Sequence, residues 1–207
     1  MAATLDAIAR HMEIDDALGT LTERVRAVTV EITSRHRFAT GSGVVWGSTG
    51  LVVTNAHVVR GRHPPVVLTG GRAFDATLIA SDPALDLAAL RVEAADLPIT
   101  LIGDSNLLRT GELVVALGSP RGISGAASLG IVYHPAAGGP SGSRWIAADV
   151  RLAPGSSGGP LADAAGRVVG INTLVAFGLA LAVPSRAVMH FLQCVRDASP
   201  QLAWSAS

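Results

Sequence analysis

The chain has 207 residues, of which 49% are hydrophobic and 15% are charged, and its 16 Lys and Arg residues balance its 16 Asp and Glu residues. This composition, together with 23 Gly and 11 Pro, is typical of a globular, β-rich protein with many tight turns and excludes intrinsic disorder. The zero net charge gives no indication of a nucleic-acid partner or of an anionic membrane surface. The single cysteine, Cys194, excludes an internal disulfide framework and a metal site built from several cysteines.

No segment of the sequence is typical of a secretory signal or a membrane span. Residues 1–10 lack a basic start followed by an apolar run. The longest apolar run, residues 174–183, is about half as long as a bilayer span requires. We therefore expect no membrane span, and the cytoplasm is favoured over the periplasm or secretion unless a leader has been removed.

The predicted elements begin with a helical region and continue as strands. Residues 4–26 carry apolar side chains at helical spacing, which predicts one or two short helices, with Asp15 or Asp16 able to cap the second. An amphipathic C-terminal helix is predicted after the last strand, with Ser185 as its expected cap. Between these helices, β-branched segments predict two sets of six strands, over residues 27–33, 43–46, 51–54, 65–69, 73–80 and 87–92, and then 113–117, 127–133, 145–149, 160–162, 167–173 and 178–183.

The spacing of these strands predicts the fold class. Strands and turns alternate regularly with no helices between them, which favours antiparallel barrels or sandwiches over an α/β sheet. The expected organisation is therefore all-β, with an N-terminal helical segment, two six-stranded units and a C-terminal helix with its tail. These four regions cover residues 1–26, 27–96, 97–184 and 185–207.

A glycine-rich stretch around Ser157 has a pattern that suits nucleophilic catalysis. It runs Pro154-Gly155-Ser156-Ser157-Gly158-Gly159-Pro160-Leu161. Glycine lets backbone N–H groups converge, so those of Gly155 and Ser157 could hold an oxyanion while the Ser157 hydroxyl attacks a carbonyl carbon. By itself, such a stretch is more often a surface turn.

A serine nucleophile needs a base and an orienting acid, and two residues of the first half fit these roles. His57 follows the apolar segment 51–54, and Asp86 precedes the apolar segment 87–92. A partly buried carboxylate needs a partner, and a neutral histidine donating from Nδ1 is a suitable one. Taken singly, His57 could be a core histidine and Asp86 a strand-start cap. The order His, Asp, Ser, with the serine in the second unit, is that of the chymotrypsin-type double barrel.

The nucleophile elbow of α/β-hydrolases is the alternative use of a Gly-x-Ser-x-Gly pattern. That fold needs a helix directly after the serine and the chain order Ser, Asp, His. Here Pro160 and the turn over residues 163–166 follow the serine instead. We therefore set the α/β-hydrolase alternative aside.

Many ordered blocks of the sequence resemble the HtrA/Deg branch of the trypsin-like serine peptidases. The similarity covers roughly residues 25–195. The matching residues are Gly41-Ser42-Gly43, Thr54-Asn55-Ala56-His57-Val58-Val59, Asp82-Pro83, Asp86-Leu87-Ala88, Gly103-Asp104-Ser105, Gly118-Ser119-Pro120, Asp149, the stretch from Pro154 to Leu161, Gly170-Ile171-Asn172-Thr173 and Ala182-Val183-Pro184-Ser185.

The resemblance implies a chymotrypsin-like double six-stranded β-barrel that works as a serine endopeptidase. His57 would be the general base, Asp86 its orienting partner and Ser157 the nucleophile, with no metal or organic cofactor. The implied oxyanion hole consists of the N–H groups of Gly155, Ser156 and Ser157. Ser156 stands where the family usually has asparagine, which matters little because backbone groups form the hole. Many members also carry C-terminal PDZ domains, but none is expected in this chain.

The resemblance also implies where the primary specificity pocket lies. Its walls would include Leu152, Thr173, Leu179 and Leu181, which predicts cleavage after small to medium aliphatic residues such as Val, Ala or Leu. Arg151 stands where tryptic enzymes place an acid, so no preference for Lys or Arg is expected. We expect Arg151 to point to solvent; if it points into the pocket, it would favour an acidic side chain.

Protein or peptide segments are the expected substrates. Family members commonly form trimers through N-terminal segments, so residues 4–26 are candidates for a homotrimer contact, and they could equally pack on their own barrel. Two other function classes use the same residues. One is a catalytically idle barrel that acts as a binding module, and the other is an esterase on the same triad.

Overall fold

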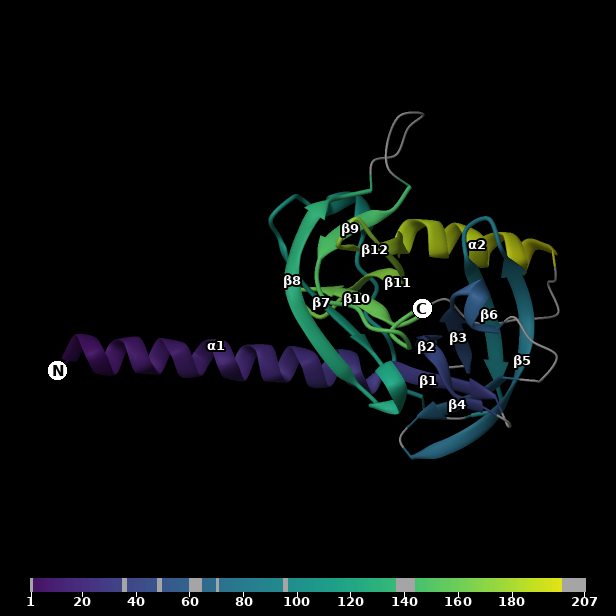
Figure 1. The fold of residues 1–207 in the computed structure, drawn as a ribbon, viewed down its shortest axis with the longest axis horizontal. Helices are drawn as coiled ribbons and strands as arrows, with labels where there is room; N and C mark the ends of the chain where they lie inside the picture. The colour runs from purple at the N-terminus through teal and green to yellow at the C-terminus, as the bar shows by residue number, and fades with distance from the viewer. Residues whose placement is uncertain are drawn as a thin grey trace.

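Two closed six-stranded antiparallel barrels form the body of the molecule, with one helix at each end of the chain (Figure 1). The computed structural model describes residues 2–34, 37–47, 50–59, 65–69, 71–94, 97–136 and 144–198. This architecture confirms the predicted all-β double barrel with terminal helices. The predicted boundary at residue 96 and the tail after residue 198 lie outside the described residues.

The first barrel joins its strands in the order β1-β2-β3-β6-β5-β4. Val30 and Ile32 alternate along β1 and point inward, where they pack with Val52 of β3 and Leu90 of β6. Each of these four side chains is at most 1% exposed, so this barrel has its own closed core. Its strands are β1 (Thr29–Ser34), β2 (Arg37–Gly47), β3 (Leu51–Thr54), β4 (Pro65–Thr69), β5 (Arg72–Asp82) and β6 (Leu87–Val92).

The second barrel repeats the arrangement in the order β10-β11-β12-β9-β8-β7. Val114 and Ala116 alternate along β7 and pack with Val132, Ile146 and Leu161 from neighbouring strands. All five are buried, which gives the second barrel a separate core. Its strands are β7 (Leu113–Gly118), β8 (Ala126–His134), β9 (Ile146–Asp149), β10 (Pro160–Asp163), β11 (Val168–Ala176) and β12 (Leu179–Pro184).

The N-terminal region forms one helix, α1 (Ala2–Ala27), instead of one or two short ones. This segment contains no proline, and extending a formed helix costs less than nucleating a second, so the chain continues through Gly19. Asp15 and Asp16 consequently lie inside the helix and cap nothing. Thr29 Oγ1 donates to the Val25 carbonyl at 2.8 Å, where the helix gives way to β1.

The two ends of α1 have different surroundings. The C-terminal end packs against the second barrel, where Val25 is 1% exposed beside Val115 and Leu117 of β7. The N-terminal end extends away from both barrels, at the left of Figure 1. Neither helix of the described chain combines the length and the apolar character that crossing a bilayer would require.

A shared apolar cluster joins the two barrels to the C-terminal helix, α2 (Ser185–Ala198). Leu87 comes from the first barrel and Ile171 from the second, and both are fully buried. Phe191 of α2 is 6% exposed in the same cluster, and Figure 1 shows α2 lying across the junction of the barrels. The helix therefore ties the two halves together.

The start of α2 is fixed by two buried serines. Ser105 Oγ accepts the Arg186 N–H at 3.3 Å, which supplies the cap expected from Ser185. Ser185 itself lies in the first turn, where its Oγ donates to the Gly103 carbonyl at 2.6 Å and accepts the Ser105 N–H at 3.2 Å. The predicted helix is thus present, but its capping group comes from a distant segment.

The shared cluster yields a stability prediction. Phe191→Ala should lower the free energy of unfolding by about 3–5 kcal/mol, because it removes a buried ring where both barrels and α2 meet. Urea denaturation followed by circular dichroism measures this change. Met189→Ala on the same helix is the control, since Met189 is 40% exposed and its loss should cost far less. Equal losses in the two variants would show that the cluster does not hold the barrels together.

Candidate active site

A bonded histidine and aspartate lie at the edge of the first barrel, facing the second. His57 lies in a 3-10 turn, Ala56–Val59, directly after β3, and Asp86 directly precedes β6. His57 Nδ1 lies 2.8 Å from Asp86 Oδ2, and the His57 backbone N–H donates to Asp86 Oδ1 at 3.0 Å. Because an ionised carboxylate can only accept, Nδ1 is the donor and Nε2 remains able to take a proton.

Asp86 adopts a backbone conformation that few side chains tolerate. Its φ is 55°, in the left-handed region, which costs a non-glycine residue about 1 kcal/mol or more. The buried Asn55 compensates by donating from Nδ2 to the Asp86 carbonyl at 2.9 Å. In the preceding turn, Asp82 Oδ1 accepts the N–H groups of Ala84 and Leu85 at 2.8 and 3.1 Å. The carboxylate of Asp86 is therefore aimed by its neighbours.

The second barrel reaches Asp86 through Thr173. Thr173 Oγ1 donates to Asp86 Oδ2 at 2.6 Å, and the Thr173 carbonyl accepts the Ser157 hydroxyl at 2.9 Å. The pairing of β11 with β12 shifts between Asn172 and Leu174, so Thr173 has no partner in that ladder. Such a bulge re-aims a side chain. Thr173 is one of the residues predicted to line the specificity pocket, and its hydroxyl bonds to the carboxylate of the other barrel.

Ser157 lies next to this pair without being bonded to the histidine. Its Oγ donates to the Thr173 carbonyl, and the hydrogen bonds among described residues include none between Ser157 and His57. Thr173 links Ser157 to the histidine–aspartate pair. Its carbonyl accepts from the Ser157 hydroxyl, and its own hydroxyl donates to Asp86. Catalytic hydrogen bonds often tighten only when substrate binds, so the lack of this bond is compatible with a catalytic pair.

The turn before Ser157 has defined geometry. Ser156 N–H donates to the Ala153 carbonyl at 2.9 Å, and Gly155 has a φ of 103°. With Pro154 and Gly155 at its two central positions, this is a type II β-turn. The N–H of Ser156 is therefore already used, which removes it from the expected set of three oxyanion donors in this conformation. The N–H groups of Gly155 and Ser157 have no acceptor among the residues that the structure describes.

Close packing with the first barrel holds this loop in place. Gly158 lies against Ser42 of β2 and has no room for a side chain, because a Cβ on Gly158 would lie 2.0 Å from the Ser42 carbonyl oxygen. Gly158 also has a φ of 87° and donates its N–H to the Asn172 carbonyl at 2.8 Å. The glycines of this stretch are thus needed for two reasons, a left-handed turn and contact between backbones.

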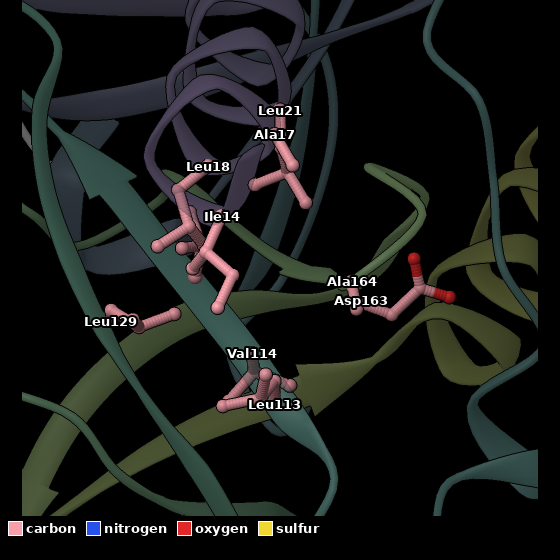
Figure 2. Close-up of a pocket in the computed structure, with 10 residues that line it drawn as sticks. Ile14, Ala17, Leu18, Leu21, Leu113, Val114, Leu129, Asp163 and Ala164 are labelled. Atoms are coloured by element: carbon pink, nitrogen blue, oxygen red, sulfur yellow. The ribbon is translucent and has the colours of Figure 1, made fainter. Parts of the chain in front are cut away.

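The remaining residues of the expected pocket lie on the second barrel. Leu152, Leu179 and Leu181 are half-buried, and Leu152 packs against the core of that barrel. Arg151 is exposed, and its N–H donates to Ser128 Oγ at 3.0 Å. A separate apolar pocket of about 230 Å³ lies between α1 and β7–β8 (Figure 2). None of His57, Asp86 and Ser157 lines it.

Asn55 and Ser42 are two residues of the site that were not among the predicted site residues. Both are fully buried polar side chains that bond to backbone carbonyls, of Asp86 and Gly155 respectively. The only local signals are that Asn55 lies two residues before His57, at the end of an apolar strand, and that Ser42 lies between two glycines. Neither position follows from hydrophobic periodicity.

Comparisons with known proteins agree with this geometry. Residues 41–171 match the family model of the trypsin-like peptidase domain. The chain is 41% identical to human serine protease HTRA4 over 161 residues, which are 73% of this chain and 34% of that protein. It is 39% identical over 179 residues to a probable periplasmic serine endoprotease, DegP-like, from a Marinomonas species, covering 82% of this chain and 38% of that one.

A solved structure shows the same likeness. The HtrA-type protease AlgW with a decapeptide superposes with a TM-score of 0.76 at 26% identity, covering 86% of this chain and 66% of that chain. The present chain spans about a third of the length of the curated relatives that it matches. The matched region includes His57, Asp86 and Ser157. The chain therefore belongs to the trypsin-like peptidase family, and within it to the HtrA-type serine proteases.

Proposed function

We propose that this chain is a serine endopeptidase that hydrolyses peptide bonds in unfolded or exposed protein segments, with His57, Asp86 and Ser157 as its triad. The observation that carries this proposal is the pair of bonds on Thr173. Its hydroxyl holds the Asp86 carboxylate that orients His57, and its carbonyl holds the Ser157 hydroxyl. Base, acid and nucleophile are thereby gathered around one residue at the junction of the barrels.

The reaction proceeds through an acyl-enzyme. Ser157 Oγ leaves the Thr173 carbonyl, gives its proton to His57 Nε2 and attacks the substrate carbonyl carbon. His57 then returns the proton to the leaving amine, which breaks the peptide bond. Water, deprotonated in turn by His57, attacks the acyl carbon and releases the acid with Ser157 restored. Asp86 holds the imidazole in the required tautomer and stabilises the imidazolium that forms.

Negative charge on the substrate oxygen would be stabilised by two backbone donors, the N–H groups of Gly155 and Ser157. Each such donor is worth about 3 kcal/mol of barrier reduction. Ser156 contributes its backbone to the type II turn instead, since its N–H is bonded to Ala153. The Ser156 N–H would thus help to shape the turn next to the oxyanion hole but would not bind the oxyanion itself.

The substrate chain would lie along β11. Residues 174–176 of this strand pair with β12 on one side, and Leu174 and Val175 are 43% and 54% exposed. An extended peptide can add to such a strand edge through backbone hydrogen bonds, with side-chain pockets giving specificity. The half-buried Leu152, Leu179 and Leu181 would form an aliphatic primary pocket.

Active-site labelling tests the triad. A fluorophosphonate probe should label the wild type and leave Ser157→Ala unlabelled, and casein cleavage should disappear in the same variant, because the probe and the substrate both need the Ser157 hydroxyl. Ser81→Ala is the control, since Ser81 is an exposed serine on β5. Labelling with ester turnover but no peptide cleavage would indicate an esterase. The absence of both labelling and cleavage would indicate a binding module.

Cleavage-site profiling tests the pocket. With a peptide library, the wild type should cut after Val, Ala or Leu, because the pocket residues are aliphatic and no acid is placed among them. Leu181→Ala should move the preference toward larger side chains. Ile131→Ala is the control, because Ile131 is a 41% exposed residue of β8. Dominant cleavage after Asp or Glu would contradict the aliphatic pocket and implicate Arg151.

The N-terminal helix supports association into a homotrimer. Ile14 of α1 is 58% exposed and, with Leu18 and Leu21, lines the apolar pocket opposite Leu113 and Leu129 of the second barrel (Figure 2). The last two residues are 50% and 49% exposed. A second copy of the chain would remove this apolar surface from water.

Mass measurement in solution tests the trimer. Light scattering coupled to gel filtration should give three times the chain mass for the wild type and a smaller mass for Ile14→Glu, because the substitution puts a charge on the apolar surface. Glu13→Gln, at an exposed neighbouring position, should keep the wild-type mass. A monomeric wild type would mean that α1 packs only on its own barrel.

A further inference from the structure

Ser42 is a buried serine whose backbone and side chain both bond to the loop from Pro154 to Gly158, called the nucleophile loop because it carries Ser157. It lies in β2 of the first barrel and is fully buried. Its backbone N–H donates to the Ser157 carbonyl at 2.8 Å, and its hydroxyl donates to the Gly155 carbonyl at 2.7 Å. The loop that carries the nucleophile is thus attached to the opposite barrel at two carbonyls.

The direction of the hydroxyl bond is fixed by a third segment. The Ser119 N–H, which follows β7, donates to Ser42 Oγ at 2.8 Å. A hydroxyl has one proton, and an N–H can only donate, so Ser42 must give its own proton to the Gly155 carbonyl. The bonds form a one-way chain from Ser119 through Ser42 to Gly155, in which each bond polarises the next.

One held carbonyl lies between the two proposed oxyanion donors and the other directly follows the second. The Gly155 carbonyl belongs to the peptide unit between Gly155 and Ser156, which lies between the unit that carries the Gly155 N–H and the unit that carries the Ser157 N–H. Fixing that middle unit restricts rotation of both neighbours. The Ser157 carbonyl is fixed in turn by the Ser42 N–H. Ser42 therefore acts on the orientation of both donors without touching substrate.

We propose that Ser42 is a positioning residue for proteolysis, whose hydroxyl holds the Pro154–Ser157 turn with the Gly155 and Ser157 N–H groups aimed at the oxyanion. This inference rests on the function proposed above. A positioning role differs from a purely stabilising one in its effect on kinetics. Loss of the Ser42 hydroxyl should then weaken transition-state binding more than substrate binding.

Ser185 provides a matched control. It is also fully buried, its Oγ also donates to a glycine carbonyl, that of Gly103 at 2.6 Å, and it also accepts a serine N–H, that of Ser105 at 3.2 Å. These contacts fix the start of α2 and include no residue of the nucleophile loop. Ser185→Ala therefore removes the same number and kind of bonds at a place remote from the chemistry.

The experiment compares Ser42→Ala, Ser185→Ala and the wild type with a quenched fluorescent peptide, counting active sites by Ser157 labelling. Both variants should lower Tm. Only Ser42→Ala should lower kcat per labelled site, by about 10- to 100-fold with KM little changed, because misplaced donors cost rate more than substrate affinity. The affinity for a peptide boronate, whose tetrahedral adduct occupies the oxyanion site, should fall by a similar factor in Ser42→Ala alone.

Equal kcat in Ser42→Ala and Ser185→Ala would overturn the positioning role while leaving the proteolytic function in place. A wild type with no Ser157-dependent labelling or cleavage would remove the proposed function and this inference with it. If Ser42→Ala does not fold, Ser42→Cys takes its place under reducing conditions. It keeps the shape but donates weakly, so kcat should again fall, and an unchanged kcat would overturn the inference.

Discussion

One carboxylate oxygen, Asp86 Oδ2, receives hydrogen bonds from both barrels. His57 Nδ1 reaches it from the first barrel at 2.8 Å and Thr173 Oγ1 from the second at 2.6 Å. The apolar cluster beneath α2 brings the barrels together, but apolar contacts are not directional and cannot set one angle between them. Hydrogen bonds to one oxygen can, because they depend on distance and direction. In this arrangement the backbone of Asp86 adopts a strained, left-handed conformation.

At a second set of contacts at the junction, backbone segments lie against each other. Only glycine leaves enough room for this close approach. Besides Gly158, Gly118 of β7 is restricted, since a Cβ there would lie 2.7 Å from the Ser156 Cα. These glycines let β2, the end of β7 and the nucleophile loop approach closely enough for Ser42 of β2 to bond to the other two segments. Preorganisation of this kind leaves little reorganisation for the reaction itself. The two sets act on different parts of the site, the proposed base and the proposed oxyanion donors.

The fold was largely predictable because its strands carry periodic signals. Val30 and Ile32 alternate in β1 as a half-buried strand requires, and the strand spacing favoured antiparallel barrels or sandwiches. The double barrel itself was implied by the resemblance to a known family, and the structure confirms it. Contacts between distant segments were not predictable. The hydroxyl of Ser42 has no local partner, and Ser105 caps a helix that starts far along the chain. The use of the Ser156 N–H did have a local signal, since Pro and Gly at successive positions favour a type II turn.

The division of the proposed triad between the barrels has a consequence for how the protein is made. Domains generally fold as units with the N-terminal one first during synthesis. The first barrel ends with β6 and holds His57 and Asp86, whereas Ser157 and Thr173 belong to segments translated much later. A ribosome-bound chain with only its first barrel folded would have no nucleophile and no second donor to Asp86. An endopeptidase arranged in this way would stay inert toward nascent polypeptides around it until its second barrel had been translated and folded.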